Sequence, residues 1–248
     1  MWNTVFFQPL YNALVWLVGN MPDGSVALAI IVLTVVVKLI LAPLSFKALK
    51  SQVIQKELQP HMVHIRKEYP DKKEQSVKIM ELYKKFKTNP FSGCLVILIQ
   101  IPIIFALYYV FLRGLDFNTE LLYTAVHYPD VVTTTFLGID MNVKSLAFAL
   151  AAGLAQFIQL YFSPARIDSQ KEDTLVSQDT KPTFADQFGS NLQKQMLYTM
   201  PIIIVIVGMA VPAAVSLYWI VTNVFAFIQE FLAKKRLAQI RASYYSAE

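Results

Sequence analysis

The chain has 248 residues, of which 55% are hydrophobic, and its mean hydropathy of +0.45 excludes an ordinary soluble domain. The formal net charge is +5 and is spread unevenly, and the single cysteine, Cys94, excludes an intramolecular disulfide. We therefore expect an all-α polytopic membrane protein.

Residues 1–20 contain no Lys or Arg, and apolar and aromatic residues recur among them near helical spacing. A secretory signal needs a positive segment and a small-residue cleavage site, and neither is clear here. The pattern favours a helix lying in the membrane interface and kinked at Pro9, and a short extra span is the alternative. The apolar residues of this helix are Trp2, Phe6, Leu10, Tyr11 and Leu14.

Residues 26–46 are long and apolar enough to cross a bilayer, since ~20 such residues match the hydrocarbon thickness. Lys38 lies near the middle of this stretch, where a charge costs roughly 2.5–3.5 kcal/mol on insertion scales. Thr34 precedes Lys38 by one helical turn on the same face. Lys38 therefore either snorkels to the headgroups or faces a hydrated cavity within the membrane, and this stretch alone leaves both open.

Residues 47–89 form a polar region with eleven Lys and Arg against five Asp and Glu, a net charge of +6 (11 − 5). Apolar residues recur at helical intervals on both sides of Tyr69-Pro70-Asp71, which predicts two amphipathic helices joined by a turn. Such a basic hairpin is either a solvated face near anionic lipid or a docking surface for a ribosome, a nascent chain or a targeting factor. Its apolar residues are Leu58, Met62, Ile65, Val77, Met80, Leu82 and Tyr83.

Three further apolar regions follow, at 90–113, 146–163 and 196–233. The last is too long for one crossing and is broken at Val211-Pro212-Ala213-Ala214, which predicts a helical hairpin of two spans. The polar stretch 164–195 is expected to be disordered in its central part, where hydrophobicity is low.

The positive-inside rule orients the chain, because the eleven basic residues of 47–89 place that region in the cytoplasm. Five spans then put the N-terminus outside and the C-terminus inside. The predicted organisation is an external interfacial helix at 1–25, a first span at 26–46, a cytosolic hairpin at 47–89, a second span at 90–113, an external loop at 114–145, a third span at 146–163, a cytosolic loop at 164–195, a fourth span at 196–211, a fifth span at 212–233 and a basic cytosolic tail at 234–248.

No phosphate-binding loop, metalloprotease motif or Ser/His/Asp set is present, so we expect no enzyme, no cofactor and no metal site. We also expect no acidic residue inside any span, which argues against a proton or sodium transporter of the usual kind. Each polar residue in a span could form an ordinary helix–helix hydrogen bond, worth ~0.6 kcal/mol on average, but the collection around one lysine favours a hydrated groove. The candidate groove residues are Lys38, Thr34, Gln100, Gln156, Gln159, Ser216, Tyr218, Trp219, Thr222 and Asn223.

Four stretches of the chain, in order, resemble the YidC/Oxa-type membrane protein insertases, and the likeness covers roughly residues 24–235. The first is TVVVKLILAPL at 34–44, with Lys38 where this family most often has arginine. The others are Leu58-Gln59-Pro60 with Asp71-Lys72-Lys73 and Leu82-Tyr83-Lys84 in the hairpin, Asn89-Pro90 with Gly93-Cys94, Gln100-Ile101-Pro102 and Ala106-Leu107-Tyr108-Tyr109 in the second span, and Met200-Pro201-Ile202-Ile203 with the segment 217–223 (LYWIVTN) in the last two spans.

The resemblance implies five transmembrane helices around a hydrophilic groove that is open to cytoplasm and lipid and closed outside. It implies a multi-pass protein of the bacterial plasma (inner) membrane that inserts small membrane proteins and helps them fold without using a nucleotide. Its implied partners are nascent membrane proteins and the phospholipid bilayer, with the ribosome, the signal recognition particle receptor and the Sec translocon as further candidates; no nucleic-acid binding is expected.

The chain departs from the family pattern in several places. Lys38 keeps the charge of arginine but lacks its planar fork, so a diffuse field is expected rather than a fixed grip on a carboxylate. Pro212-Ala213-Ala214 replaces the commoner Pro-Ser-Gly turn, and the loop 164–195 is longer than usual. A minimal form is expected, since no large outer domain and no lipid-attachment cysteine precede the first span.

Two other functions fit the same spans. A small-anion transporter or channel would use Lys38 as its anion site but usually shows an internal repeat, and none is visible. An assembly scaffold for other membrane complexes would not insert a substrate by itself.

Overall fold

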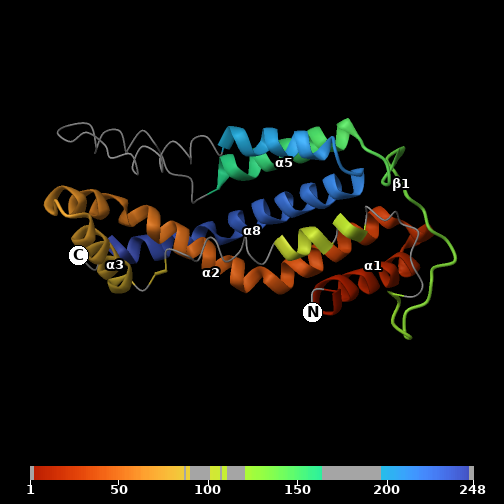
Figure 1. Cartoon of the computed structure of the whole chain (residues 1–248), viewed down its shortest axis with the longest axis horizontal. Coiled ribbons are helices and arrows are strands. Elements are labelled where there is room, and N and C mark those ends of the chain that lie inside the picture. Colours follow the sequence, from red (N-terminus) through yellow and green to blue (C-terminus); the bar gives the residue numbers. More distant parts are fainter. Residues whose placement is uncertain are drawn as a thin grey trace.

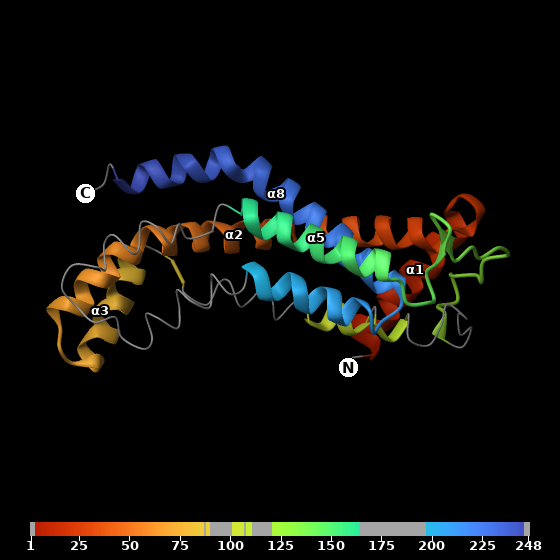
Figure 2. The same ribbon diagram turned by 90° about the horizontal axis from the view of Figure 1, so that it is seen from above.

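The computed structural model describes residues 3–86, 88–89, 101–106, 108–110, 121–163 and 197–245. Long helices lie side by side along the long axis of the molecule, with a small β-hairpin at one end and a helical hairpin at the other (Figures 1 and 2). Of the predicted second span, 90–113, the structure describes residues 101–106 and 108–110, and these are helical. The expected disorder in 164–195 lies outside the described residues.

The N-terminal segment is a π-helical turn, Asn3–Phe7, followed by the helix α1, Gln8–Asn20. Phe7 has helical backbone angles, so the segment is continuous and changes from π-helical to α-helical geometry directly before Pro9, which lies in the first turn of α1. The kink at Pro9 stays a prediction. Leu14, Val15 and Val18 are fully buried against the rest of the protein. The inward face of α1 therefore belongs to the main core; whether its outer face lies in the membrane interface stays a prediction.

The helix α2 runs without interruption over Val26–Glu68 and passes through Pro43 and Pro60. Ser25 caps its start by accepting the backbone N–H of Leu28 at 3.4 Å. No helix therefore ends at residue 46, because α2 continues from the predicted span into the predicted hairpin. Its stretch of membrane-compatible length and hydropathy is Val26–Gln55.

The turn at Tyr69-Pro70-Asp71 is present, and Asp71 caps the next helix, α3 (Lys72–Lys85), by accepting the N–H of Lys73. The contact between α2 and α3 is a small apolar cluster in which Tyr83 donates its O–H to Met62 Sδ at 3.3 Å. Burial raises the pKa of the Tyr83 phenol, which keeps it protonated as this donor. The cluster consists of Ile54, Leu58 and Met62 from α2 with Ile79, Leu82, Tyr83 and Phe86.

Two residues that the sequence pattern assigned to the apolar faces of the hairpin point outward instead. Val77 is 56% exposed and Met80 44% exposed, whereas Ile79 and Phe86 pack inward. The pattern was ambiguous here because apolar residues surround α3 on more than one side. This leaves two apolar side chains on the outer surface of the hairpin.

A β-hairpin in the predicted external loop ties the beginnings of two long helices together. The strands β1 (Thr135–Phe136) and β2 (Ile139–Asp140) are antiparallel, and the φ angles of 52° at Leu137 and 77° at Gly138 form a turn of the type that matches strand twist. The backbone N–H of Val26 donates to Thr133 O at 3.0 Å, and that of Ala213 donates to Val143 O at 2.8 Å. The expectation of an all-α chain missed this element.

The remaining helices are α5 (Leu146–Phe162), a helix at Leu197–Gly208 and α8 (Ala213–Tyr245). The helical structure is interrupted between Gly208 and Ala213, and α5 begins at Leu146. That these helices are membrane spans stays a prediction. The helix at 197–208 packs so closely on α5 that a side chain at Gly153 would meet Val205 and the Pro201 carbonyl. The predicted basic tail is helical as far as Tyr245.

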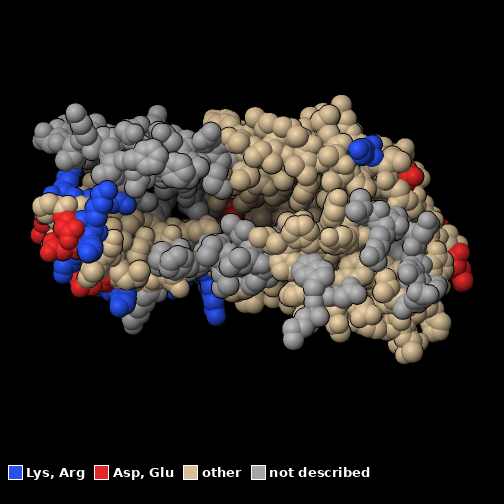
Figure 3. All heavy atoms as spheres, in the orientation of Figure 1, with Lys and Arg blue, Asp and Glu red and all other residues tan. Residues whose placement is uncertain are grey.

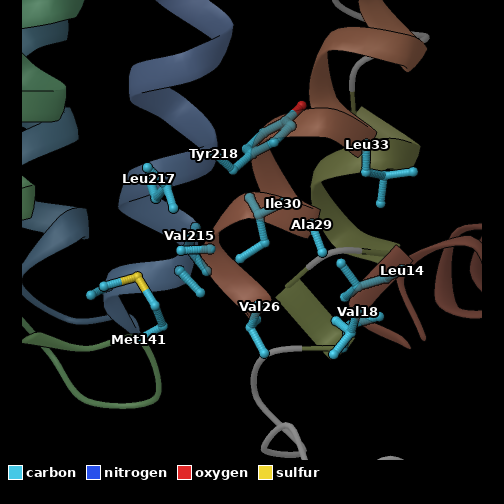
Figure 4. Packing of buried hydrophobic residues seen from close by; sticks show 14 of the residues in the cluster. Leu14, Val18, Val26, Ala29, Ile30, Leu33, Met141, Val215, Leu217 and Tyr218 are labelled. Carbon is cyan, nitrogen blue, oxygen red and sulfur yellow. The ribbon is translucent and has the colours of Figure 1, made fainter. Parts of the chain in front are cut away.

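The main core joins α1, α2 and α8 with the external loop (Figure 4). Leu14 and Val18 of α1, Ile30 of α2 and Val215 of α8 meet there with almost no exposed surface. Elsewhere, many large apolar side chains are on the outside. On α5 they recur every four residues or so as one stripe: Leu146, Leu150, Leu154, Ile158 and Phe162.

Candidate functional site

Lys38 and Thr34 lie on α2, one turn apart, as the sequence predicted. Thr34 is 3% exposed and donates its hydroxyl to Ile30 O at 2.6 Å, so its polar group is satisfied within its own helix. Lys38 is half-buried, although the α2 residues directly after it, Leu39 and Ile40, are exposed. The lysine therefore faces the protein rather than the outer surface of α2.

α8 presents polar residues at intervals of seven, which places them on one face of the helix. These are Ser216, Asn223 and Glu230. Ser216 is fully buried and Asn223 is 6% exposed. Within the described residues, Ser216 Oγ, Thr222 Oγ1 and Asn223 Nδ2 are buried and make no hydrogen bond.

Two contacts fix how α5 lies against this face. Gln159 Nε2 donates to Glu230 Oε1 at 2.8 Å, and a Cβ placed on Gly208 would lie 2.9 Å from Ala149 Cβ and 3.1 Å from Ser216 Oγ. α5 and α8 run in the same direction, and the bond between Gln159 and Glu230 places the half-buried Gln156 at the level of Phe227, one turn from Asn223.

The helix α2 lies against another side of α8, also in parallel. Gln229 Nε2 donates to Ala42 O at 3.1 Å, which joins α8 to the turn of α2 that follows Lys38. α2 and α5 are therefore both held to α8 by glutamine side chains near the end of its apolar part.

The structure brings only some of the predicted groove residues together. Tyr218 is 3% exposed and points from α8 toward α2 beside Ile30, in the main core (Figure 4). Ser216 lies in the tight contact with Gly208, and Gln100 lies outside the described residues. Thr34 and Lys38 lie one turn apart on α2, and the half-buried Gln156 and Gln159 lie one turn apart on α5. Thr222, Asn223 and the half-buried Trp219 lie within about one turn of each other on α8.

The expectation that no acidic residue lies in a span is wrong. Glu230 falls within the predicted fifth span, 212–233, and within the membrane-compatible stretch Ala213–Ala233 of α8. The signal that could have found it is the interval of seven from Ser216 and Asn223, which extends the polar face to Glu230. Glu230 lies near the end of this span, four residues before the first lysine of the basic tail, Lys234.

The surface is hollowed in the middle of the face seen in Figure 3, between the layer of α5 and the layer of α2. Acidic atoms are visible inside this hollow. Lys and Arg gather at the end that carries the α2–α3 hairpin. In the described part of the chain, no three His, Cys, Asp or Glu side chains gather as they would around a metal ion.

The fold and these surfaces define a helical membrane protein. α2 and α8 contain apolar stretches of 30 and 21 residues, which suffice to cross a bilayer. Large apolar side chains also cover the outside of α5 and of the helix at 197–208, where a soluble protein would be polar.

Comparison with known proteins names the family. The model of the 60Kd inner membrane protein family matches residues 16–240. The chain belongs to this family, the YidC/Oxa family, and the resemblance seen in the sequence is confirmed.

Similar proteins include "Membrane protein insertase YidC" of Oceanobacillus iheyensis, 31% identical over 242 residues that make up 94% of this chain and 84% of the relative. "Membrane protein insertase YidC 2" of Bacillus anthracis is 32% identical over 241 residues, 94% of this chain and 81% of the relative. A crystal structure of an active YidC insertase with its first transmembrane domain resolved superposes with a TM-score of 0.56 at 22% identity, over 92% of this chain and 45% of that one. At this identity the superposition shows a shared fold.

Proposed function

We propose that this protein inserts small membrane proteins into the bilayer and assists their folding. The observation that carries the proposal is Lys38, a half-buried charge within the apolar stretch Val26–Gln55 of α2. The names of the relatives support the same activity.

The proposed mechanism uses five membrane-spanning helices around a hydrated groove. Its polar lining comes from α2, α5 and α8, where Thr222 and Asn223 have buried polar atoms that can bond water or a peptide backbone. Lys38 attracts the acidic or polar flank of a substrate, while the apolar segment partitions into lipid. The membrane potential adds ~2.3 kcal/mol per charge per 100 mV, so no nucleotide is needed.

We further propose the orientation with the N-terminus outside and the α2–α3 hairpin in the cytoplasm of a bacterial cell. The basic charge of that hairpin supports this orientation through the positive-inside rule. It also makes the hairpin the proposed docking surface for the ribosome, the signal recognition particle receptor or the Sec translocon.

The test is insertion of a short single-span substrate with an acidic tail into proteoliposomes that contain the full chain. We expect Lys38→Ala to slow insertion about tenfold or more, because a partly buried charge pair is lost, and Lys38→Arg to preserve it. A substrate with a neutral tail is the matched control and should respond much less to Lys38→Ala. Equal insertion by the native protein and Lys38→Ala would show that Lys38 only snorkels, and no insertion by the native protein would favour an assembly scaffold.

A further inference from the structure

The outer face of α3 carries a line of four exposed side chains, which we call the outer stripe. Its members, Lys73, Val77, Met80 and Lys84, are separated by four, three and four residues, so they follow one side of the helix. The opposite side of α3 packs on α2 through the apolar cluster of the hairpin. Val77 and Met80 lie outside that cluster, so the contact between the two helices does not account for them.

The outer stripe has an apolar centre and a lysine at each end. Single exposed apolar side chains are ordinary on a protein surface, but Val77 and Met80 are neighbours about one helical turn apart. Among the described residues, the ion pair of α3 joins Lys78 with Glu81, and neither end lysine takes part in it. The stripe therefore offers an apolar contact between two lysines whose backbones are ~16 Å apart along the helix.

The direction of α3 argues against a lipid surface as the occupant of this stripe. Close to the turn, Gln75 Nε2 donates to Tyr69 O at 2.6 Å. Further along, Tyr83 donates to Met62 Sδ at 3.3 Å, so α3 folds back along α2. α2 is one helix from its apolar stretch, Val26–Gln55, into the hairpin. A bilayer around the apolar stretch would lie across this axis, whereas the outer stripe runs along it and does not lie flat on the lipid.

The residues beside the stripe argue against a nucleic acid. Glu74 and Glu81 lie three and four residues from Val77, so both border the apolar centre. A nucleic-acid strand carries a phosphate at each nucleotide and would place phosphates against these carboxylates and against Val77 and Met80. A peptide can instead place apolar side chains at the centre and acidic side chains only at the two ends.

We propose that the outer stripe of α3 docks an acidic amphipathic helix of a protein partner. The apolar side chains of this helix cover Val77 and Met80, and carboxylates near its two ends meet Lys73 and Lys84. A helix of about three turns is long enough to reach both lysines. The inference rests on the proposed function, in which the hairpin is a cytosolic docking surface, and gives that surface a definite face and a definite partner chemistry.

The test is binding of a fluorescent synthetic peptide to the full chain in nanodiscs of phosphatidylcholine, which leave both ends of the protein accessible. The peptide is an amphipathic helix of about four turns, with leucines at the centre of one face and glutamates at both ends of that face. We expect Val77→Ala combined with Met80→Ala to weaken binding about tenfold, because both apolar contacts are lost. Lys73→Glu should weaken binding about fivefold and should favour a second peptide that has lysines in place of the glutamates.

Lys72→Glu is the matched control, because it makes the same change of charge at an exposed position in the same helical turn but off the stripe. It should change binding much less than Lys73→Glu. The inference is overturned if the two charge variants act alike, if the double alanine variant binds as the native protein does, or if the native protein does not bind the peptide. Tighter binding of a structured RNA than of the peptide, weakened by Lys73→Glu, would assign the stripe to nucleic acid and overturn it as well.

Hydrogen exchange of the α3 amides in each variant shows that a loss of binding is not a loss of the hairpin. The binding assay involves no insertion, so its failure refutes this inference alone. Failure of the native protein to insert a substrate into proteoliposomes would refute the proposed function and leave the measured binding of the stripe unchanged.

Discussion

Gly24 lies where the backbone before α2 closely approaches the loop that contains Val131. Its φ is 60°, and a side chain there would collide with the Val131 carbonyl. We expect Gly24→Ala to destabilise the protein by ~1–2 kcal/mol for the left-handed conformation, plus ~1–3 kcal/mol for the crowding. The measurement is the midpoint of thermal unfolding in detergent.

Gly138 provides the matched control, because its φ is 77° but nothing lies within 4 Å of a side chain built there. Gly138→Ala should therefore show only the conformational cost, and its midpoint should fall less than that of Gly24→Ala. Equal decreases would mean that the loop moves away from Gly24 without cost.

Among single residues, the sequence singles out those that contrast with their neighbours in the chain, and it misses those whose hydrogen-bond partners are distant in the sequence. Lys38 and Thr34 stand out because a charge and a hydroxyl interrupt an apolar run. Asn12 does not, yet its side chain is 3% exposed, accepts the N–H of Tyr123 at 2.7 Å and donates to Leu121 O at 3.0 Å. These bonds fasten α1 to a loop more than 100 residues away, a contact that no spacing within α1 reveals.

At the scale of elements, the α2–α3 hairpin is held by few contacts and should open independently of the rest. Leu58 is 2% exposed in its apolar cluster, and truncating such a side chain costs about 2–5 kcal/mol. We expect Leu58→Ala to speed hydrogen exchange of the α3 amides at least tenfold, since 1.4 kcal/mol corresponds to a factor of ten. Exchange in α5 should not change.

Val77→Ala is the control within the same hairpin, because Val77 is 56% exposed and lies outside the cluster. It should leave the exchange of α3 close to that of the native protein. A similar acceleration by both variants would show that α3 is held by an outer contact instead.

The elements themselves were predictable where the chain carries a strong start or stop signal. α5 begins after Ser145, which caps it, and α8 begins after Pro212, so both starts agree with the sequence within a residue. The predicted end of the first span at residue 46 matches no helix end, because α2 tolerates Pro43 and continues to Glu68 as one helix. Two-residue strands such as β1 and β2 leave almost no periodic pattern to detect.

For the molecule as a whole, the charges separate along the long axis. The basic α2–α3 hairpin lies at one end and the β-hairpin at the other, with the apolar helices between them (Figures 1 and 3). A membrane that enclosed the apolar middle would place the two ends on opposite sides, and the positive-inside rule predicts that the α2–α3 hairpin is the cytoplasmic end.

Cysteine labelling in whole cells tests this arrangement, and the chain suits it because Cys94 is its single cysteine. In a Cys94→Ser background, Leu137→Cys lies at an 81% exposed position of the β-hairpin, and Ser76→Cys lies at an exposed position of α3. A membrane-impermeant maleimide should label Leu137→Cys in intact cells and Ser76→Cys only after permeabilisation, because the bilayer separates the two ends. Labelling of both in intact cells would contradict the enclosed middle, and the reverse pattern would show that the protein has the opposite orientation.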